Sequence, residues 1–188
     1  MELLTIGIIL LIILIVVILL LVFWGIYNKI IRHENRIDNA WAQIDVQLKR
    51  RADLIPNLME TVKGYMKHER QTLESVTNAR AAIMSAKTPQ EANNANNMLT
   101  GALKTLFAVA ESYPDLKASQ NFLSLQDELT HTEEKIAFSR QHFNDSVLTY
   151  NNAIETFPGN FFARWMGRKT REMLQIPEAS REVPKVSF

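Results

Sequence analysis

The sequence predicts an all-α protein in which an N-terminal transmembrane helix is followed by an antiparallel, up-and-down four-helix bundle. The first observation behind this prediction is an apolar run at the N-terminus that is long enough to cross a bilayer. The second is that apolar residues in the rest of the chain recur three, four and seven positions apart, which places them on one face of a helix. The third is that the 188 residues include only 6 glycines and 6 prolines, too few for a turn-rich β fold.

The apolar run opens the chain, and no charged residue lies between Glu2 and Lys29. A bilayer core of about 30 Å needs roughly 20 helical residues, so this run is long enough to span it. Trp24 and Tyr27 stand where the helix would leave the bilayer, a position that amphipathic rings favour. A cleaved signal peptide would instead have a basic start, a shorter apolar core and a small-residue cleavage site. We therefore predict a retained, single-pass anchor over residues 1–28.

The charges that flank the apolar run predict its orientation. Lys29, Arg32 and Arg36 follow it closely, whereas no Lys or Arg precedes it. Cytoplasmic flanks of membrane spans carry an excess of Lys and Arg. The C-terminal domain is therefore predicted to be cytoplasmic.

The first helix after the anchor is predicted from Trp41, Ile44 and Leu48, whose spacing of three and four marks one helix face. We expect these three side chains to pack in the core. Three cations follow at residues 49–51, where they suit the negative end of a helix, and Pro56 then interrupts the next apolar stretch. We favour a turn at Pro56 that begins the second helix, because an up-and-down bundle needs one there. The alternative is a single long helix kinked at the proline.

Three further helices complete the predicted bundle, which covers residues 29–157. The second helix carries apolar residues at helical spacing up to residue 83. The stretch "TPQE" at residues 88–91 is a capping box with proline at the first helical position, so the third helix begins there. The last and longest stripe ends at the turn signal "FPGN" and includes Phe122 and Phe143, which we expect in the core. Short connections predict that neighbouring helices are antiparallel.

Residues 158–188 differ from the bundle in composition. Their first part, "GNFFARWMGRKTR", combines aromatic and basic residues on a short amphipathic helix, and the remainder has the prolines and mixed polarity of an extended tail. Aromatic rings beside cations are what an interfacial helix uses to hold a membrane surface. We hypothesise that this helix docks on the bilayer or on another protomer; an equally supported interpretation is that its rings cap the end of the bundle. The candidate contacts are Phe161, Phe162, Arg164, Trp165, Arg168 and Lys169.

Composition and motifs argue against several functional classes. The formal net charge of +1 gives no electrostatic footprint for nucleic acid, and the absence of cysteine excludes disulfides, thiol nucleophiles and cysteine-ligated metals. A dinuclear metal site in a bundle needs two Glu-x-x-His motifs and two further glutamates, and the chain has one such motif, Glu128 with His131. We expect both to lie on a solvated face, and we predict no catalytic, cofactor-binding or metal-binding residues. The cations of residues 49–51 could hold anionic lipid, but we prefer their role at a helix end.

Several long stretches carry a family resemblance. They are "NAWAQIDVQLKRRADLIPNL", "ETVKGYMKHE", "LTGALKTLFAVAESYPDLKASQNFLSLQDEL", "IAFSRQHFND", "YNNAIETFPGN" and the terminal "REVPKVSF", which together cover nearly all of residues 35–188. In these stretches the chain resembles the LemA family of bacterial membrane proteins. The resemblance implies a single-span protein of the bacterial inner membrane with a compact helical bundle, and it brings no established activity, cofactor or catalytic residue. Relatives are connected with membrane zinc proteases through gene neighbourhood, and one branch looks like magnetosome-membrane proteins.

These features together predict a non-enzymatic, membrane-anchored scaffold that presents a helical bundle to partners. The lipid bilayer is one expected partner. Self-association or binding to other membrane proteins is also expected, because heptad stripes can pair between copies. The alternative is an adaptor or regulator of membrane proteolysis or envelope stress, which depends on family context alone.

Overall fold

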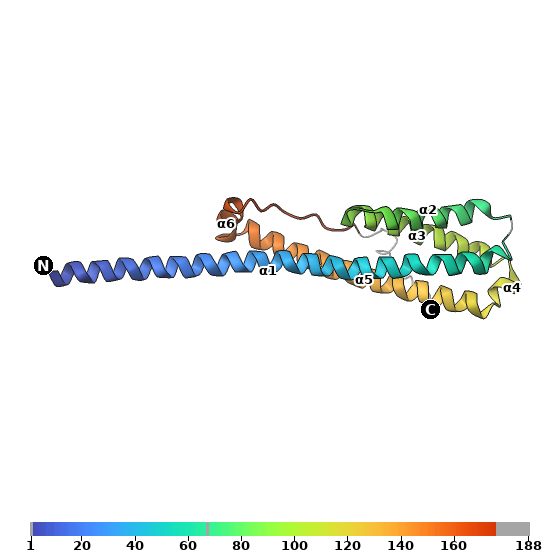
Figure 1. Ribbon diagram of the computed structural model, residues 1–188, viewed down its shortest axis with the longest axis horizontal. Helices are drawn as coiled ribbons and strands as arrows, with labels where there is room; N and C mark the ends of the chain where they lie inside the picture. The colour runs from blue at the N-terminus through green and yellow to red at the C-terminus, as the bar shows by residue number, and fades with distance from the viewer. Residues whose placement is uncertain (1, 67, 176–188) are drawn as a thin grey trace, which may run out of the picture. The chain divides into compact units, whose positions relative to one another are not determined.

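The computed structural model describes residues 2–66 and 68–175, and every regular element in these ranges is helical. The long helix α1 runs from Glu2 to Lys63 (Figure 1). The remaining helices are α2 (Arg70–Ser85), α3 (Pro89–Ala110), α4 (Pro114–Lys117), α5 (Gln120–Glu155) and α6 (Gly159–Trp165). The all-α prediction, with an apolar N-terminal helix and several helices after it, is confirmed. The end of the predicted tail, residues 176–188, lies outside the described residues.

The chain forms two compact units. Unit 1 consists of Met1–Asn39 and Asp145–Glu172, and unit 2 consists of Ala40–Asn144 and Met173–Phe188. The helices α1 and α5 therefore each contribute one part to each unit. The domain boundaries expected after residues 28 and 157 stay a prediction.

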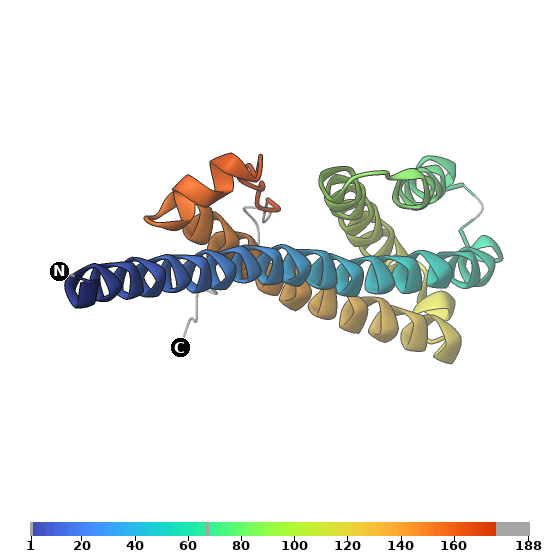
Figure 2. The same ribbon diagram turned by 60° about the vertical axis from the view of Figure 1, so that its left-hand side comes forward.

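Unit 2 is an up-and-down helical bundle. Its part of α1 runs alongside α2, α3 and its part of α5, and the chain reverses direction from each of these helices to the next (Figure 1 and Figure 2). The apolar stripes of the four helices meet in the core, where burial of apolar surface supplies most of the stabilisation. The largest fully buried side chains of this unit are Leu48, Ile55, Leu58, Val62, Met66, Leu99, Leu106, Leu116, Leu129 and Ile136.

The start of α3 follows the predicted capping pattern. Thr88 is the N-cap in extended conformation, and its side-chain oxygen accepts a hydrogen bond of 3.2 Å from the backbone N–H of Glu91. The Glu91 carboxylate in turn accepts a hydrogen bond of 2.8 Å from the backbone N–H of Lys87. The first bond pairs an N–H group that a helix start otherwise leaves without a partner, and the second ties Glu91 to the residue before the cap.

The favoured turn at Pro56 is wrong, because α1 continues through Pro56 and ends at Lys63. Proline has no N–H, so the carbonyl of Ala52, four residues earlier, loses its helical partner. Arg80 of α2 replaces that partner: its Nε donates a hydrogen bond of 2.9 Å to the Ala52 oxygen. Ala52 is fully buried, with 0% of its surface exposed, so water would not otherwise reach the site. The turn comes instead at Gly64 and Tyr65, directly after the end of α1. The hydrogen bond from Arg80 explains how α1 accommodates a proline in its interior.

This arrangement predicts that Arg80 and Pro56 are energetically coupled. Arg80→Met should lower the free energy of unfolding by about 1–3 kcal/mol, because it leaves a buried carbonyl unpaired. In a Pro56→Ala background the restored N–H at position 56 pairs with Ala52, so the same Arg80→Met change should cost markedly less. Urea denaturation of the four variants in detergent micelles, followed by circular dichroism, measures the coupling. An equal cost of Arg80→Met in both backgrounds would contradict this account of the proline.

An extended segment, Met173–Gln175, packs on unit 2 and is held by amide side chains. Asn144 of α5 makes a paired contact with Leu174: its Nδ2 donates to the Leu174 oxygen at 3.0 Å, and its Oδ1 accepts from the Leu174 N–H at 2.8 Å. Two amides of α3 donate to the neighbouring carbonyls, Gln90 to Met173 at 3.3 Å and Asn93 to Gln175 at 3.2 Å. Leu174 is buried as a result, with 3% of its surface exposed.

Unit 1 joins the first part of α1 to the end of α5, α6 and the segment that follows α6. Its buried hydrophobic side chains are Ile30, Ile37, Val147, Tyr150, Ile154 and Ala163. The Tyr150 hydroxyl donates to the backbone oxygen of Lys169 at 3.2 Å. Asn151 pairs with the backbone of Arg171 through two hydrogen bonds of 2.9 Å each. The segment after α6 is therefore tied to α5 although it has no regular secondary structure.

Candidate functional site

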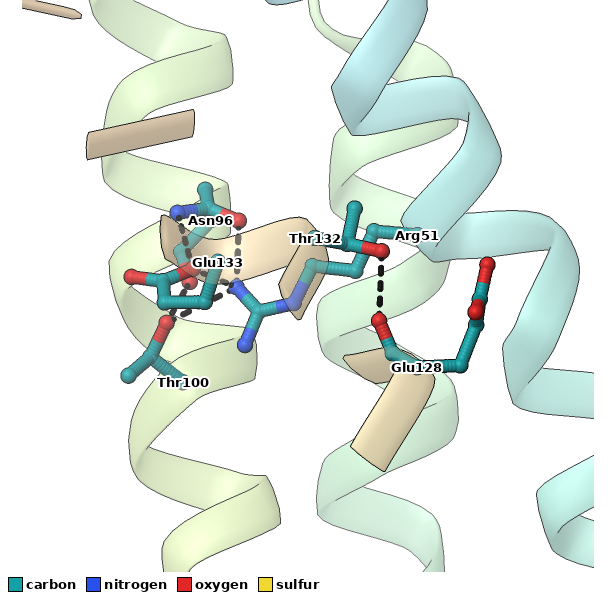
Figure 3. Close-up of polar contacts among 6 residues, drawn as sticks. All are labelled: Arg51, Asn96, Thr100, Glu128, Thr132 and Glu133. Atoms are coloured by element: carbon teal, nitrogen blue, oxygen red, sulfur yellow. Dashed lines mark hydrogen bonds and ion pairs between the residues drawn. The ribbon is translucent and has the colours of Figure 1, made fainter. Parts of the chain in front are cut away.

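The most distinctive feature of unit 2 is a group of polar side chains inside the bundle (Figure 3). We call it the Arg51 cluster, and it comprises Arg51 of α1, Asn96 and Thr100 of α3, and Glu133 of α5. Arg51 and Asn96 are almost completely buried, with 3% and 0% of their surfaces exposed. Three helices therefore meet at one charged contact.

Arg51 is the centre of the hydrogen bonds in this cluster. Its Nη1 donates to the Asn96 side-chain oxygen at 2.6 Å and to the Thr100 hydroxyl at 2.9 Å, and it forms an ion pair with Glu133. The Asn96 Nδ2 also donates to Glu133, at 3.3 Å. In Figure 3 these side chains converge on the guanidinium, whereas Thr132 bonds back along α5 to the Glu128 carbonyl.

A second buried cation influences the Arg51 cluster, whose one carboxylate is that of Glu133. Arg140 of α5 is also buried, with 4% of its surface exposed. Burial lowers the pKa of Arg51, an effect that Glu133 opposes and Arg140 reinforces. Burial likewise lowers the pKa of Arg140, again opposed by Glu133. A guanidinium stays protonated in proteins, so two buried cations depend on one carboxylate. Such a contact ties helices together in one register and is weak evidence for stability by itself.

The sequence interpretation missed this cluster. It assigned Arg51 to a helix end, whereas α1 continues for 12 residues beyond it, to Lys63. A signal was present: Arg51 follows Leu48 by three residues and therefore lies on the apolar stripe of α1. Asn96 and Glu133 interrupt the stripes of α3 and α5 in the same way, four residues after Ala92 and Leu129. Polar residues within the apolar stripes of α1, α3 and α5 were therefore the sequence signal that could have identified the cluster.

The other two cations of residues 49–51 lie on the surface. Lys49 pairs with Asp45 at 2.6 Å within α1, and Arg50 forms an ion pair with Glu128 of α5. His131, the partner of Glu128 in the single Glu-x-x-His motif, is exposed and lies 3.5 Å from Glu134. Among the residues that the structure describes, no group of three or more His, Cys, Asp or Glu side chains is placed to hold a metal ion.

Four of the five expected core residues are buried in unit 2, and the fifth is half-buried. The exposed fractions are 2% for Ile44 and Leu48, 3% for Phe122 and 4% for Phe143. Trp41 is half-buried and packs edge-on against Phe143, with ring centroids 6.3 Å apart. These rings pack α1 against α5 inside unit 2.

The candidate contact residues after the bundle all lie in unit 1. Phe162 is half-buried and packs against Phe23 of α1, with ring centroids 5.3 Å apart. Trp165 approaches the same ring at 5.5 Å, yet 70% of its surface is exposed, as is 71% of that of Phe161. Arg164 and Lys169 are also exposed.

Arg168 belongs to a second polar group, which the sequence did not indicate. Together with Arg171 it contacts one carboxylate oxygen of Glu34 on α1, at 3.0 and 3.2 Å. A shallow pocket of about 250 Å³ opens beside this carboxylate and is lined by Glu34, Tyr150 and residues 167–171. Burial and the nearby Glu34 charge raise the pKa of Tyr150. The side chain of Glu34 is only 13% exposed, so the two arginines hold a largely buried carboxylate.

Within the described residues, one helix has the length and apolar composition of a membrane span. That helix is α1, and its apolar part lies near the N-terminus with its side chains exposed. Comparison with known proteins then decides the family: the model of the LemA family matches residues 40–188. The chain belongs to the LemA family. The matched region begins at Ala40, after the apolar part of α1.

Individual relatives agree with this assignment. The protein called LemA of Metamycoplasma hominis is 30% identical over 164 residues, which cover 85% of this chain and 74% of that protein. The magnetosome protein MamQ of Magnetospirillum gryphiswaldense is 35% identical over 71 residues, but these cover only 38% of this chain and 26% of that protein. MamQ 1 and MamQ 2 of Paramagnetospirillum magneticum are 34% identical over 74 residues. The names of these relatives state no reaction.

Proposed function

We propose that this LemA protein is a non-enzymatic, membrane-anchored scaffold whose helical bundle binds other proteins, including further copies of itself. The observation that carries the proposal is the continuity of α1, which is one helix from Glu2 to Lys63. Its first part has the composition of a membrane span, and its last part supplies core residues of unit 2. An anchor and a folded bundle that share one helix are suited to holding a binding surface at a membrane.

The chemistry of the interior supports a scaffold over an enzyme. The buried Arg51 guanidinium is engaged by Asn96, Thr100 and Glu133, so its main role is to join three helices. An enzyme would need an acid, base or nucleophile free to meet a substrate in a pocket. Several large apolar side chains of unit 2 are exposed on its outside, and they offer apolar surface that a protein partner would bury.

Three exposed apolar positions provide the test of partner binding. Val46 on α1, Met98 on α3 and Phe138 on α5 have 59%, 60% and 75% of their surfaces exposed. The chain contains no cysteine, so a single introduced cysteine reports one position without background. The test is oxidative cross-linking in native membranes of single-cysteine variants at these positions, with matched exposed polar positions on the same helices as controls. The variants are Val46→Cys, Met98→Cys and Phe138→Cys, and the controls are Asp53→Cys, Asn94→Cys and Glu134→Cys.

We expect dimers, or adducts with other membrane proteins, at one or more of the apolar positions and much less at the matched polar ones. Monomer alone at all six positions would contradict the scaffold proposal. Mass spectrometry of the adducts identifies the partner, and a membrane protease as the principal adduct would instead favour an adaptor in membrane proteolysis.

The charges on the two sides of the span support an anchor in the bacterial inner membrane with the bundle on its cytoplasmic side. Lys29, Arg32 and Arg36 follow the apolar run, and Glu2 precedes it. The excess of Lys and Arg on one flank favours the cytoplasm for that flank. Labelling of Phe138→Cys with a membrane-impermeant maleimide tests this orientation, since a cytoplasmic cysteine reacts only after the membrane is opened.

A further inference from the structure

The short helix α6 is attached to the end of the apolar run through aromatic contacts inside unit 1. Phe23 lies near the end of that run, next to Trp24. The rings of Phe162 and Trp165 pack edge-on against Phe23, with centroids 5.3 and 5.5 Å away. If the run spans the bilayer, Phe23 lies where hydrocarbon gives way to headgroups. Contact with Phe23 places α6 at that same depth.

The orientation of α6 is fixed by its buried side. Gly159 and Ala163 are buried, and a Cβ added to Gly159 would lie 1.9 Å from the backbone oxygen of Ala153. No larger residue allows this close approach to α5. The rings on the other side of the helix therefore point outward, and Phe161 and Trp165 remain about 70% exposed.

Exposed rings extend beyond α6 itself. Phe157, just before the helix, has 87% of its surface exposed, and Trp24 on α1 has 64%. All four exposed rings belong to α6, to the residues just before it or to the end of the apolar run. Trp and Phe are also the residues that interfacial helices insert at the level of the headgroups.

The charges around these rings are mostly positive and favour contact with an anionic membrane surface. Residues 24–38 and 157–171 together contain seven Lys and Arg residues and two acids, Glu34 and Asp38. Glu34 is already occupied by Arg168 and Arg171. Arg164 and Lys169 are exposed, and Lys169 also lines the pocket beside Glu34. A bilayer rich in anionic phospholipid supplies the matching negative charge.

We propose that α6 is an interfacial helix that lies in the headgroup layer of the leaflet where α1 leaves the bilayer. Anionic lipid holds it there. Phe161 and Trp165 enter the boundary between headgroups and acyl chains, and Arg164 and Lys169 contact lipid phosphates. The occupant of this surface is thus the membrane and not a second protein. The inference requires the span in α1 but is independent of whether the bundle of unit 2 binds partners.

Quenching of tryptophan fluorescence by brominated lipids tests the position of α6 in the full chain. The chain has three tryptophans, Trp24, Trp41 and Trp165, so three variants with one tryptophan each are made by changing the other two to phenylalanine. They are reconstituted into vesicles of phosphatidylcholine and phosphatidylglycerol in equal amounts, with bromine at a shallow or a deep acyl position. Trp24 is the positive control, and Trp41, which packs against Phe143, is the negative control.

We expect the emission of Trp165 to fall with shallow bromine by a fraction comparable with that of Trp24. If bromine leaves the emission of Trp165 unchanged, like that of Trp41, the proposal is overturned. The indole would then lie in water or be buried against another copy of the chain. A second measurement keeps all three tryptophans: Phe161→Cys with a nitroxide label should be more accessible to oxygen than to a nickel chelate, and the reverse order would also overturn it.

The charge requirement has its own variant. Arg164→Gln with Lys169→Gln removes two exposed cations and leaves the two arginines on Glu34 in place. Each basic residue near an anionic surface contributes about a fivefold preference for the docked state. In the mixed vesicles, quenching of Trp165 in this variant should be weaker than in the protein with Arg164 and Lys169. It should fall to the level that the protein with both cations shows in vesicles of phosphatidylcholine alone. Undiminished quenching in the mixed vesicles would show that anionic lipid does not hold α6.

Discussion

Phe143→Ala is expected to lower the free energy of unfolding by about 3–5 kcal/mol. Phe143 lies on α5 with 4% of its surface exposed, and its ring packs edge-on against Trp41 of α1. Truncation removes that contact and leaves a cavity that the bundle fills only in part, because protein interiors are close-packed. Urea denaturation of the full chain in detergent micelles, followed by circular dichroism, measures the change.

The same helix offers a matched control, Phe138→Ala. Phe138 is five residues earlier on α5 and has 75% of its surface exposed. Its truncation should change the free energy of unfolding by less than about 0.5 kcal/mol. Comparable losses for the two phenylalanines would contradict the packing of Phe143 against Trp41 in the core of unit 2.

Much of the fold could be predicted from the sequence because apolar periodicity is a local property. Ile44, Leu48 and Phe122 were expected in the core because of their positions on helix stripes, and all three are buried. The start of α3 could be predicted for a similar reason, since Thr88 and Glu91 are close in sequence and cap the same helix end. Each of these features depends on residues within a few turns of one another.

Features that depend on distant residues could not be predicted in this way. Pro56 is a turn signal by itself, and only the hydrogen bond from Arg80 to the Ala52 carbonyl explains how α1 continues through it. That bond joins residues 28 positions apart, and no local pattern announces it. The contacts between Phe23 and α6 are a second case, because the composition of α6 indicated a surface role without indicating which residue of α1 it meets.

The Arg51 cluster lies between these two cases. The interruption of three apolar stripes by Arg51, Asn96 and Glu133 is visible in the sequence, but their convergence depends on how α1, α3 and α5 pack. Three adjacent cations in "LKRR" drew attention to their shared charge, whereas the structure gives them three different environments. Lys49 pairs within its helix, Arg50 pairs on the surface and Arg51 is buried.

Glu133→Gln is expected to have a large effect on stability, because it leaves Arg51 buried without a negative charge. Removing one partner of a buried ion pair costs about 3–5 kcal/mol, and we expect roughly 3 kcal/mol because the Glu133 side chain is itself 29% exposed. Glutamine keeps the size of the side chain and an acceptor oxygen, so the loss reports charge and not volume. The same urea denaturation in micelles measures it.

The neighbouring change Glu134→Gln is the control for Glu133→Gln. Glu134 is 70% exposed and lies near His131, so its loss should cost no more than about 0.5 kcal/mol. Combining Glu133→Gln with Arg51→Met removes both charges of the pair, and replacing a buried pair by apolar residues is often close to neutral. The double variant should therefore be more stable than the sum of the two single losses predicts. Simple additivity would show that Arg51 and Glu133 do not act as a pair, and that Asn96 and Thr100 alone hold the guanidinium in the bundle.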